Sequence, residues 1–243
     1  MATGTATTRE GGLGRLDDAV HAALAAHADP ERAAGQQRYM RSAMPYLGLT
    51  APTLRQALRP VLADPAHRFT DRAAWEAGVR RLWDGATHRE HRYAALALLG
   101  HRLYRPWRDP RLLPLLNDLV RDGAWWDLVD TIATHELREV LLDRPEVVGP
   151  VLRQWCRDES LWVRRAAVLA QVGAKARTDR DLLADGIVPN LEDPDFFARK
   201  AIGWALRDYA RTDPDWVRAF VAAHPRLSPL SRREALKHLR DVG

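Results

Sequence analysis

The chain has 243 residues, of which 46% are hydrophobic, so it is long enough to bury a substantial core. It holds a single cysteine, and no apolar run reaches the roughly 18 to 20 residues needed to cross a bilayer, which excludes a disulfide scaffold and a membrane-spanning protein. The formal net charge of +5 points to acidic partners, among which nucleic acids are the commonest. Residues 1–14 lack the features of a secretory signal. We therefore expect a flexible tail over residues 1–14 and a single cytoplasmic domain over residues 15–243.

From Leu16 onward, apolar residues recur at intervals of three and four, and no stretch alternates as a strand does, so the pattern predicts an all-α protein. Breaks between helices are marked by proline, usually after a residue that can cap a helix start. The breaks fall at Asp29-Pro30, Thr50-Ala51-Pro52, Asp64-Pro65, Asp109-Pro110, Arg144-Pro145, Asp193-Pro194, Asp213-Pro214 and Ser228-Pro229. The intervals between them predict helices of roughly 10 to 18 residues joined by short turns.

Two segments of the chain are loosely alike. Residues 162–167 and 197–202 each begin with an aromatic residue and a small or branched one, which are followed by two cations and then by small and apolar residues. Loose repeats of this kind are typical of HEAT-like arrays, in which antiparallel helix pairs stack one after another. The sequence therefore predicts an α-solenoid with a concave surface that can bind a partner.

The predicted helix Ala124–Leu141 places a carboxylate beside an aromatic side chain. At 100° per residue, the core stripe contains Trp125, Val129, Ile132, Ala133 and Val140. Trp126 and Asp130 are four residues apart and lie together at the edge of that stripe. Three interpretations of Asp130 are open: a charge on the helix surface, an ion-pair partner for Arg165, or a functional anion beside an aromatic wall.

Two further predicted helices carry charged or aromatic residues in unusual places. In Leu161–Val172, Arg165 falls within the apolar stripe, where a guanidinium needs an anion, either a carboxylate or a phosphate. In Asp195–Arg211, Trp204 falls opposite the core stripe. It shares that face with three cations: Lys200, Arg207 and Arg211. An aromatic side chain among cations is typical of surfaces that bind nucleic acid.

No metal or cofactor is expected. His88 and His91 are three residues apart, but no further cluster of Cys or His accompanies them. The sequence contains no glycine-rich phosphate loop, Gly-x-Ser-x-Gly elbow or His-Glu-x-x-His motif. We expect Cys156 to be a buried small apolar residue.

Several segments together resemble the AlkD family of HEAT-like DNA glycosylases. They are residues 125–130 (WWDLVD), 161–166 (LWVRRA), 196–209 (FFARKAIGWALRDY), 230–238 (LSRREALKH), 38–40 (RYM) and 47–49 (LGL). The resemblance covers nearly all of the chain after the tail, and the order and spacing of the segments make it specific. One departure is visible at Ala51, where a hydroxyl residue is expected in the family, so a contact to the DNA backbone is missing there.

The resemblance implies that the protein excises cationic alkylated purines, such as 3-methyladenine and 7-methylguanine, by hydrolysis of the N-glycosidic bond in duplex DNA. It implies that the damaged base stays stacked and is not flipped out. Asp130 would be the catalytic carboxylate, and Trp126 and Trp204 would be aromatic walls around the deoxyribose. The residues implied to bind DNA are Arg165 as a phosphate clamp, Tyr39 at the duplex edge, and Lys200, Arg207, Arg211, Arg55 and Lys175.

Two other functions remain open at this stage. The first is a non-catalytic α-solenoid that binds DNA or a protein, because many such arrays are scaffolds. The second is a glycosylase of the same family that is specialised for bulky adducts and protects the producer of a DNA-alkylating natural product. In each glycosylase case we expect a monomer that acts on double-stranded DNA, away from membranes and associated with the nucleoid.

Overall fold

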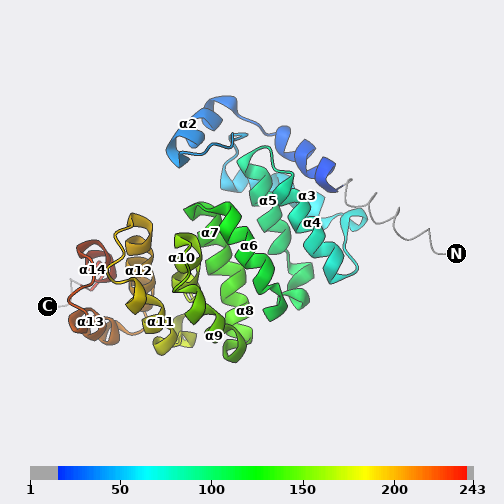
Figure 1. Ribbon diagram of the computed structural model, residues 1–243. Coiled ribbons are helices and arrows are strands. Elements are labelled where there is room, and N and C mark those ends of the chain that lie inside the picture. The colour runs from blue at the N-terminus through cyan, green and yellow to red at the C-terminus, as the bar shows by residue number, and fades with distance from the viewer. Residues whose placement is uncertain (1–15, 240–243) are drawn as a thin grey trace. The chain divides into compact units, whose positions relative to one another are not determined.

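The computed structural model describes residues 16–239, and every regular element in that range is a helix, as Figure 1 shows. The all-α prediction is therefore confirmed. The chain divides into two compact units, one ending at Trp107 and the other beginning at Arg108. No helix in the described range is both long and apolar enough to cross a bilayer. The predicted tail lies outside the described residues, and the assignment of residues 15–243 to one domain stays a prediction.

The first unit is built from helices that begin at capping residues. Its helices are residues 16–25, α2 (Pro30–Met40), α3 (Ala51–Ala63), α4 (Arg72–Asp84) and α5 (Arg89–Leu99), with 3-10 turns at Pro65–His67 and Arg102–Trp107. The side chains of Asp29, Thr50 and Asp71 accept backbone N–H groups at the starts of α2, α3 and α4. α5 packs against both α3 and α4, and Trp75 and Trp83 are buried in the core.

The loop between α2 and α3 is held by a buried carboxylate on α5. Glu90 accepts hydrogen bonds from the backbone N–H groups of Leu47, Gly48 and Leu49 at 2.9, 2.8 and 3.1 Å. Gly48 has a φ of +90°, and a Cβ there would lie 2.1 Å from the carbonyl oxygen of Asp29, so glycine is required at this position. The network fixes the start of α3 relative to α5.

The second unit stacks its helices around α10. Its elements are α6 (Leu113–Gly123), α7 (Trp126–Ile132), a π turn (Ala133–Leu137), α8 (Arg138–Asp143), α9 (Pro145–Trp155), α10 (Leu161–Leu169), α11 (Arg180–Ile187), α12 (Phe196–Tyr209), α13 (Pro214–Ala223) and α14 (Pro229–Ala235), with 3-10 turns at Pro110–Leu112, Lys175–Arg177 and Val188–Asn190. α10 packs against α6, α7, α9, α11 and α12, and α12 packs against α13 and α14. Helix pairs stacked in this way form an α-solenoid, as predicted.

The predicted helix Ala124–Leu141 differs from the observed one in two respects. It starts two residues later, because Ala124 adopts a left-handed conformation with a φ of 36° and Trp125 is extended. It is also interrupted by the π turn Ala133–Leu137, which separates α7 from α8. A π turn holds more residues than an α turn, so a single 100° wheel does not describe both halves. Trp125, which precedes α7, is half-buried and not part of a buried stripe, whereas Val129 and Val140 are buried as predicted.

The predicted breaks mark most of the observed helix starts. Six of them provide a side-chain cap with proline in the first turn, at residues 29, 50, 64, 109, 213 and 228. Arg144 precedes α9 without a side-chain cap. The break at Asp193 is real, but α12 begins only at Phe196, because Asp195 is the residue that caps it. Asp193 instead accepts a hydrogen bond from the N–H of Asp195 at 2.8 Å.

Candidate active site

Asp130 and Arg165 form a buried ion pair between α7 and α10. Arg165 Nε donates to Asp130 Oδ1 at 2.7 Å, and Nη2 donates to Oδ2 at 2.8 Å. Two parallel bonds of this kind are the strongest geometry for a guanidinium and a carboxylate. Only 4% of the Arg165 side chain and 14% of the Asp130 side chain are exposed. Of the two anions that the sequence left open for Arg165, the structure supplies a carboxylate, and Asp130 is not a solvated surface charge.

Arg165 is held by a third contact from α12. Its Nη1 donates to the carbonyl oxygen of Phe197 at 2.6 Å, and its guanidinium carbon lies 5.9 Å from the centre of the Phe197 ring. Asp130 and Phe197 thus engage three of the five N–H groups of Arg165, while the carboxylate uses two of its roughly four acceptor positions. The pair is fixed in orientation. Arg165 can still donate to a further acceptor, and Asp130 can still accept from a further donor.

The charge of Asp130 is governed by opposing effects. Burial raises its pKa above the ordinary value for an aspartate, whereas the hydrogen bonds and the charge of Arg165 oppose the rise. The carboxylate of Asp127, one turn earlier, adds a small increase to the pKa. The bidentate contact with Arg165 requires an unprotonated carboxylate. Asp130 is therefore an anion that is kept largely out of water.

An aromatic cluster adjoins the ion pair. It consists of Trp125, Trp162 and Phe197, whose ring centres lie 5.1 to 5.7 Å apart. Phe196 packs edge-on against Phe197 at 5.4 Å and is 56% exposed. This cluster was not among the site residues predicted from the sequence. The available signal was the loose repeat, in which Trp162 and Phe197 occupy the same position.

The two indoles predicted to be aromatic walls lie on α7 and α12. Trp126 is the first residue of α7, one turn before Asp130, and Trp204 lies in the second half of α12. Both side chains are half-buried, so each presents part of its surface to solvent. Because α7 and α12 both pack against α10, the helices that carry these indoles are the ones that hold Arg165. The roles of Trp126 and Trp204 as aromatic walls stay predictions.

Lys200 and Arg207 lie in a different environment from the one that the helical wheel indicated. The wheel places them on an open outer face of α12, whereas in the structure both bind Glu234 on α14. Lys200 Nζ lies 2.8 Å from Glu234 Oε1, and Arg207 Nη1 donates to Oε2. The hydrogen bond from Lys200 lowers the pKa of Glu234, which favours the paired state. Their role in DNA binding stays a prediction, and each cation already has an internal partner.

Gly203 explains why α14 can approach this face of α12. A Cβ at residue 203 would lie 2.5 Å from Glu234 Cβ and 3.2 Å from Ser231 Cα, so any larger residue would push the two helices apart. Ser231 is fully buried and donates a hydrogen bond to the carbonyl oxygen of Arg199 at 2.8 Å. The helix therefore has two packed sides and not one, which its own periodicity does not reveal.

The remaining residues predicted to bind DNA are exposed. Arg211 follows α12, and Lys175 begins a 3-10 turn with a φ of 55°. Tyr39 is 78% exposed near the end of α2, and Arg55 is exposed on α3. The last two belong to the first unit. Their contacts with DNA stay predictions.

Within residues 16–239, no group of three or more His, Cys, Asp or Glu side chains is arranged to hold a metal ion. His91 instead stacks on His21 at 4.0 Å, and burial lowers its pKa to about 4, so its ring is neutral at pH 7. Cys156 is buried as predicted, and burial raises the pKa of its thiol to about 12. Neither group offers a reactive centre.

A family model described as DNA alkylation repair enzyme matches residues 20–239. The chain belongs to this family. A solved structure described as a predicted DNA alkylation repair enzyme from Enterococcus faecalis is 27% identical, with a TM-score of 0.79. The match covers 88% of this chain and 97% of that one. No curated protein matches the chain.

Membership of the DNA alkylation repair enzyme family confirms the resemblance found in the sequence. It assigns the protein to the repair of alkylation damage, with DNA as the substrate. The match extends across both compact units, so the family assignment applies to the first unit as well as to the helices that carry Asp130.

Proposed function

We propose that this family member is a DNA glycosylase that hydrolyses the N-glycosidic bond of purines alkylated at N3 or N7, including 3-methyladenine and 7-methylguanine, and so initiates base excision repair. The buried Asp130–Arg165 ion pair is the observation that carries the proposal. A carboxylate that is fixed in place and shielded from water is suited to stabilise positive charge as it develops. Trp126 and Trp204 add aromatic faces that attract a cation.

Cleavage of the N-glycosidic bond does not need a general acid to protonate the leaving purine. Alkylation at N3 or N7 gives the purine a positive charge, and the electron pair of the breaking C1′–N bond neutralises it. The deoxyribose then carries the positive charge as an oxocarbenium ion. Water adds at C1′ and releases a proton to solvent. An ionised Asp130 suits this reaction, because its task is to stabilise the sugar cation and to accept a hydrogen bond from the attacking water.

The electrostatic stabilisation is large enough to promote cleavage only of N-glycosidic bonds that alkylation has already weakened. A carboxylate about 4 Å from the sugar stabilises its charge by about 4 kcal/mol at an effective dielectric of about 20. The guanidinium of Arg165, roughly 4 Å farther away, opposes this with about 2 kcal/mol. The net gain of about 2 kcal/mol corresponds to about 30-fold in rate. Undamaged purines, which are poor leaving groups, are therefore spared.

We further propose that the damaged base stays stacked during the reaction. The residues assigned to the site are a carboxylate and two indoles, which recognise a cation and a sugar ring and offer no pattern of donors and acceptors for a base edge. A site that does not enclose the base also tolerates bulky adducts. The protein acts on duplex DNA as a monomer, and its location follows that of the DNA.

Release of 7-methylguanine from methylated duplex DNA, followed by chromatography under single-turnover conditions, tests this function. We expect the wild-type protein to release the base. The Asp130→Asn variant should be about 1,000-fold slower, because it loses about 4 kcal/mol of stabilisation, while its affinity for DNA stays within about threefold. Asp127→Asn, which removes a carboxylate from the same helix, is the matched control and should remain close to wild type.

Two results would contradict the proposal. A wild-type protein that binds methylated duplex but releases no base would be a non-catalytic binding module. An Asp130→Asn variant as fast as the wild type would remove Asp130 from the mechanism.

A further inference from the structure

Two consecutive arginines of α10 both contact the start of α12. Arg165, which orients Asp130, donates through Nη1 to the carbonyl oxygen of Phe197 in the first turn of α12 at 2.6 Å. Arg164 donates through Nη2 to Oδ2 of Asp193 at 2.8 Å, in the loop that leads into the same helix. The two side chains therefore hold α12 against α10 at neighbouring points.

Arg164 joins two loops that are far apart in the sequence. Its Nη1 donates to the carbonyl oxygens of Asp158 and Glu159 at 2.8 and 2.9 Å, in the turn before α10. Its Nη2 binds Asp193, and only 20% of the Arg164 side chain and 13% of the Asp193 side chain are exposed. An ion pair with this degree of burial is weakened less by solvent and salt than one on the surface. The guanidinium thus ties the loop before α12 to the turn before α10.

Asp193 transmits this restraint to the first turn of α12. Its Oδ1 accepts the N–H of Asp195 at 2.8 Å, and its carbonyl oxygen accepts Nε of Arg199 at 2.9 Å. Asp195 in turn caps the helix by accepting the N–H of Phe197 at 2.6 Å. Because the N–H and the carbonyl of Phe197 belong to one residue of a capped turn, the loop that Arg164 holds also sets where that carbonyl lies.

We propose that Arg164 and Asp193 are positioning residues for the reaction at Asp130. They hold the first turn of α12 where the Phe197 carbonyl can orient Arg165. The oriented guanidinium then fixes Asp130 through its two hydrogen bonds. The proposal rests on the proposed function in taking Asp130 as the carboxylate that faces the sugar, and it requires no contact between Arg164 and DNA.

The charge of Asp130 reports on this chain of contacts. Burial raises the pKa of Asp130, the hydrogen bonds and charge of Arg165 on α10 oppose the rise, and the charge of Asp127 on α7 adds to it. If α12 is no longer held, Arg165 is oriented less well and its hydrogen bonds to the carboxylate weaken. The pKa of Asp130 should then increase, so that less of the carboxylate is ionised at a given acidic pH.

Titration of the Asp130 carboxyl carbon by NMR tests the proposal directly. We expect a higher pKa of Asp130 in Arg164→Met than in the wild type. Asp193→Asn keeps an oxygen for the N–H of Asp195 but removes the charge that binds Arg164, so it should shift the pKa in the same direction. Arg164→Lys keeps the charge opposite Asp193 and should restore most of the wild-type value.

The matched control is Arg153→Met. Arg153 on α9 donates to Asp185 on α11 at 2.6 Å, so the substitution also removes one guanidinium and one ion pair between helices. Neither partner belongs to α10 or α12. The pKa of Asp130 should therefore be the same in this variant as in the wild type.

Single-turnover release of 7-methylguanine gives a second readout. Arg164→Met should release the base about tenfold more slowly, with affinity for the duplex within about threefold, because a displaced catalytic group slows the chemical step. In an Arg165→Met background the same substitution should change the rate by less than about twofold, since Arg164 acts through Arg165.

An unchanged pKa of Asp130 in both Arg164→Met and Asp193→Asn, with melting curves like that of the wild type, would overturn the proposal. An equal rise in Arg153→Met would also overturn it, because the loss of any guanidinium would then have the same effect. A further tenfold loss of rate in the Arg165→Met background would show that Arg164 acts independently of Arg165, contrary to the proposal.

The NMR titration separates this proposal from the glycosylase proposal, because it needs neither DNA nor base release. A raised pKa of Asp130 in Arg164→Met, in a protein whose wild type releases no 7-methylguanine, supports the positioning role and contradicts the glycosylase. An unchanged pKa in a protein that does release the base contradicts the positioning role alone.

Discussion

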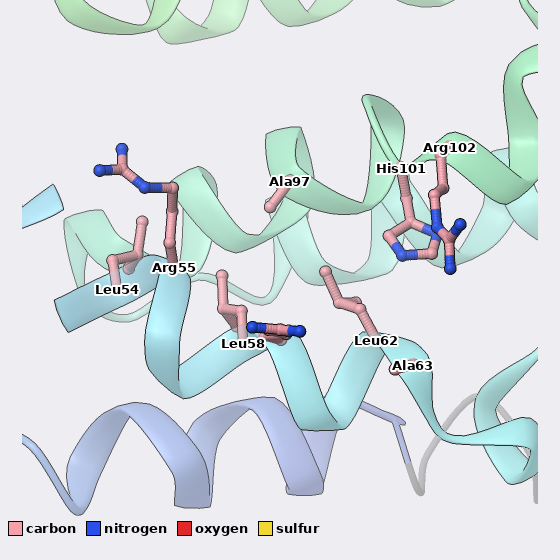
Figure 2. A pocket seen from close by; sticks show the side chains of 9 residues that line it. Leu54, Arg55, Leu58, Leu62, Ala63, Ala97, His101 and Arg102 are labelled. Atoms are coloured by element: carbon pink, nitrogen blue, oxygen red, sulfur yellow. The ribbon is translucent and has the colours of Figure 1, made fainter. Parts of the chain in front are cut away.

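Two sets of cations, one in each unit, differ in whether a carboxylate balances their charge. In the second unit, Arg165 is paired with Asp130, and Lys200 and Arg207 share Glu234. In the first unit, a groove between α3 and α5 is lined by exposed arginines that have no carboxylate partner within the described part of the chain. Figure 2 shows this groove, and its arginines are Arg55, Arg59 and Arg102. A paired cation is fixed in orientation but has much of its field cancelled, whereas an unpaired one attracts phosphate from a distance.

Removing only the carboxylate of the buried pair has the largest expected effect on base release. Asp130→Asn alone leaves the guanidinium of Arg165 without its anion, so base release should fall about 1,000-fold. Asp130→Asn/Arg165→Met removes the opposing charge as well, and release should fall by only about 30-fold from wild type. Single-turnover release of 7-methylguanine by the two variants measures the difference.

We also expect Asp130→Asn/Arg165→Met to be more stable than Asp130→Asn. Breaking a buried pair by removing one partner costs about 3 to 5 kcal/mol, whereas replacing both partners costs much less. Urea denaturation should therefore rank the double variant above Asp130→Asn. A double variant that releases base more slowly than the single variant, with normal stability, would show that Arg165 makes a contact with DNA that the ion pair does not account for.

Glu136 is a buried carboxylate of the second unit that has no ion-pair contact with any of residues 16–239. Glu136 lies in the π turn, is 4% exposed, and has one oxygen without a hydrogen-bond partner. Burial raises its pKa to about 8, while the charges of Arg108 and Arg138 lower it by less. The folded protein therefore holds a proton that the unfolded chain has lost between about pH 4.5 and pH 8.

Stability should consequently decrease as the pH rises through this range, by about 1.4 kcal/mol per pH unit from this group. Glu136→Gln keeps the shape without the titration, and its unfolding free energy should change less between pH 5 and pH 8 than that of the wild type. Urea denaturation at several pH values measures this. Parallel pH profiles for the two proteins would mean that Glu136 keeps an ordinary pKa.

The smallest expected effect comes from freeing the cations on α12. Glu234→Gln removes the negative charge that neutralises Lys200 and Arg207, so both become available to phosphate. We expect about threefold tighter binding to duplex DNA and a salt dependence that is steeper by about 1 unit. The matched control is Glu192→Gln, which breaks the exposed pair with Arg226 at 2.7 Å and should change neither quantity beyond the effect of net charge. Equal gains in both variants would exclude Lys200 and Arg207 from the DNA-binding surface.

Local features of the sequence were sufficient to predict the all-α class and most of the helix starts. Capping by Asp29, Thr50 and Asp213 depends only on residues within three positions of the cap, so it can be seen in the sequence. The unusual position of Arg165 in an apolar stripe was likewise visible, because a stripe is a property of one helix. The π turn after α7 was not visible, since hydrogen bonding and packing decide it and no residue type specifies it.

Periodicity within single helices was enough to identify the unusual residues: Arg165 among apolar neighbours, Asp130 beside Trp126, and Trp204 among cations. Which of these groups contact one another depends on how the helices pack. Asp130 and Arg165 are 35 residues apart, and Glu234 reaches Arg207 across 27 residues. A helical wheel fixes the direction of a side chain around its own axis, but the packing of separate helices determines what lies in that direction. For that reason the anion of Arg165 and the second packed face of α12 became known only from the fold.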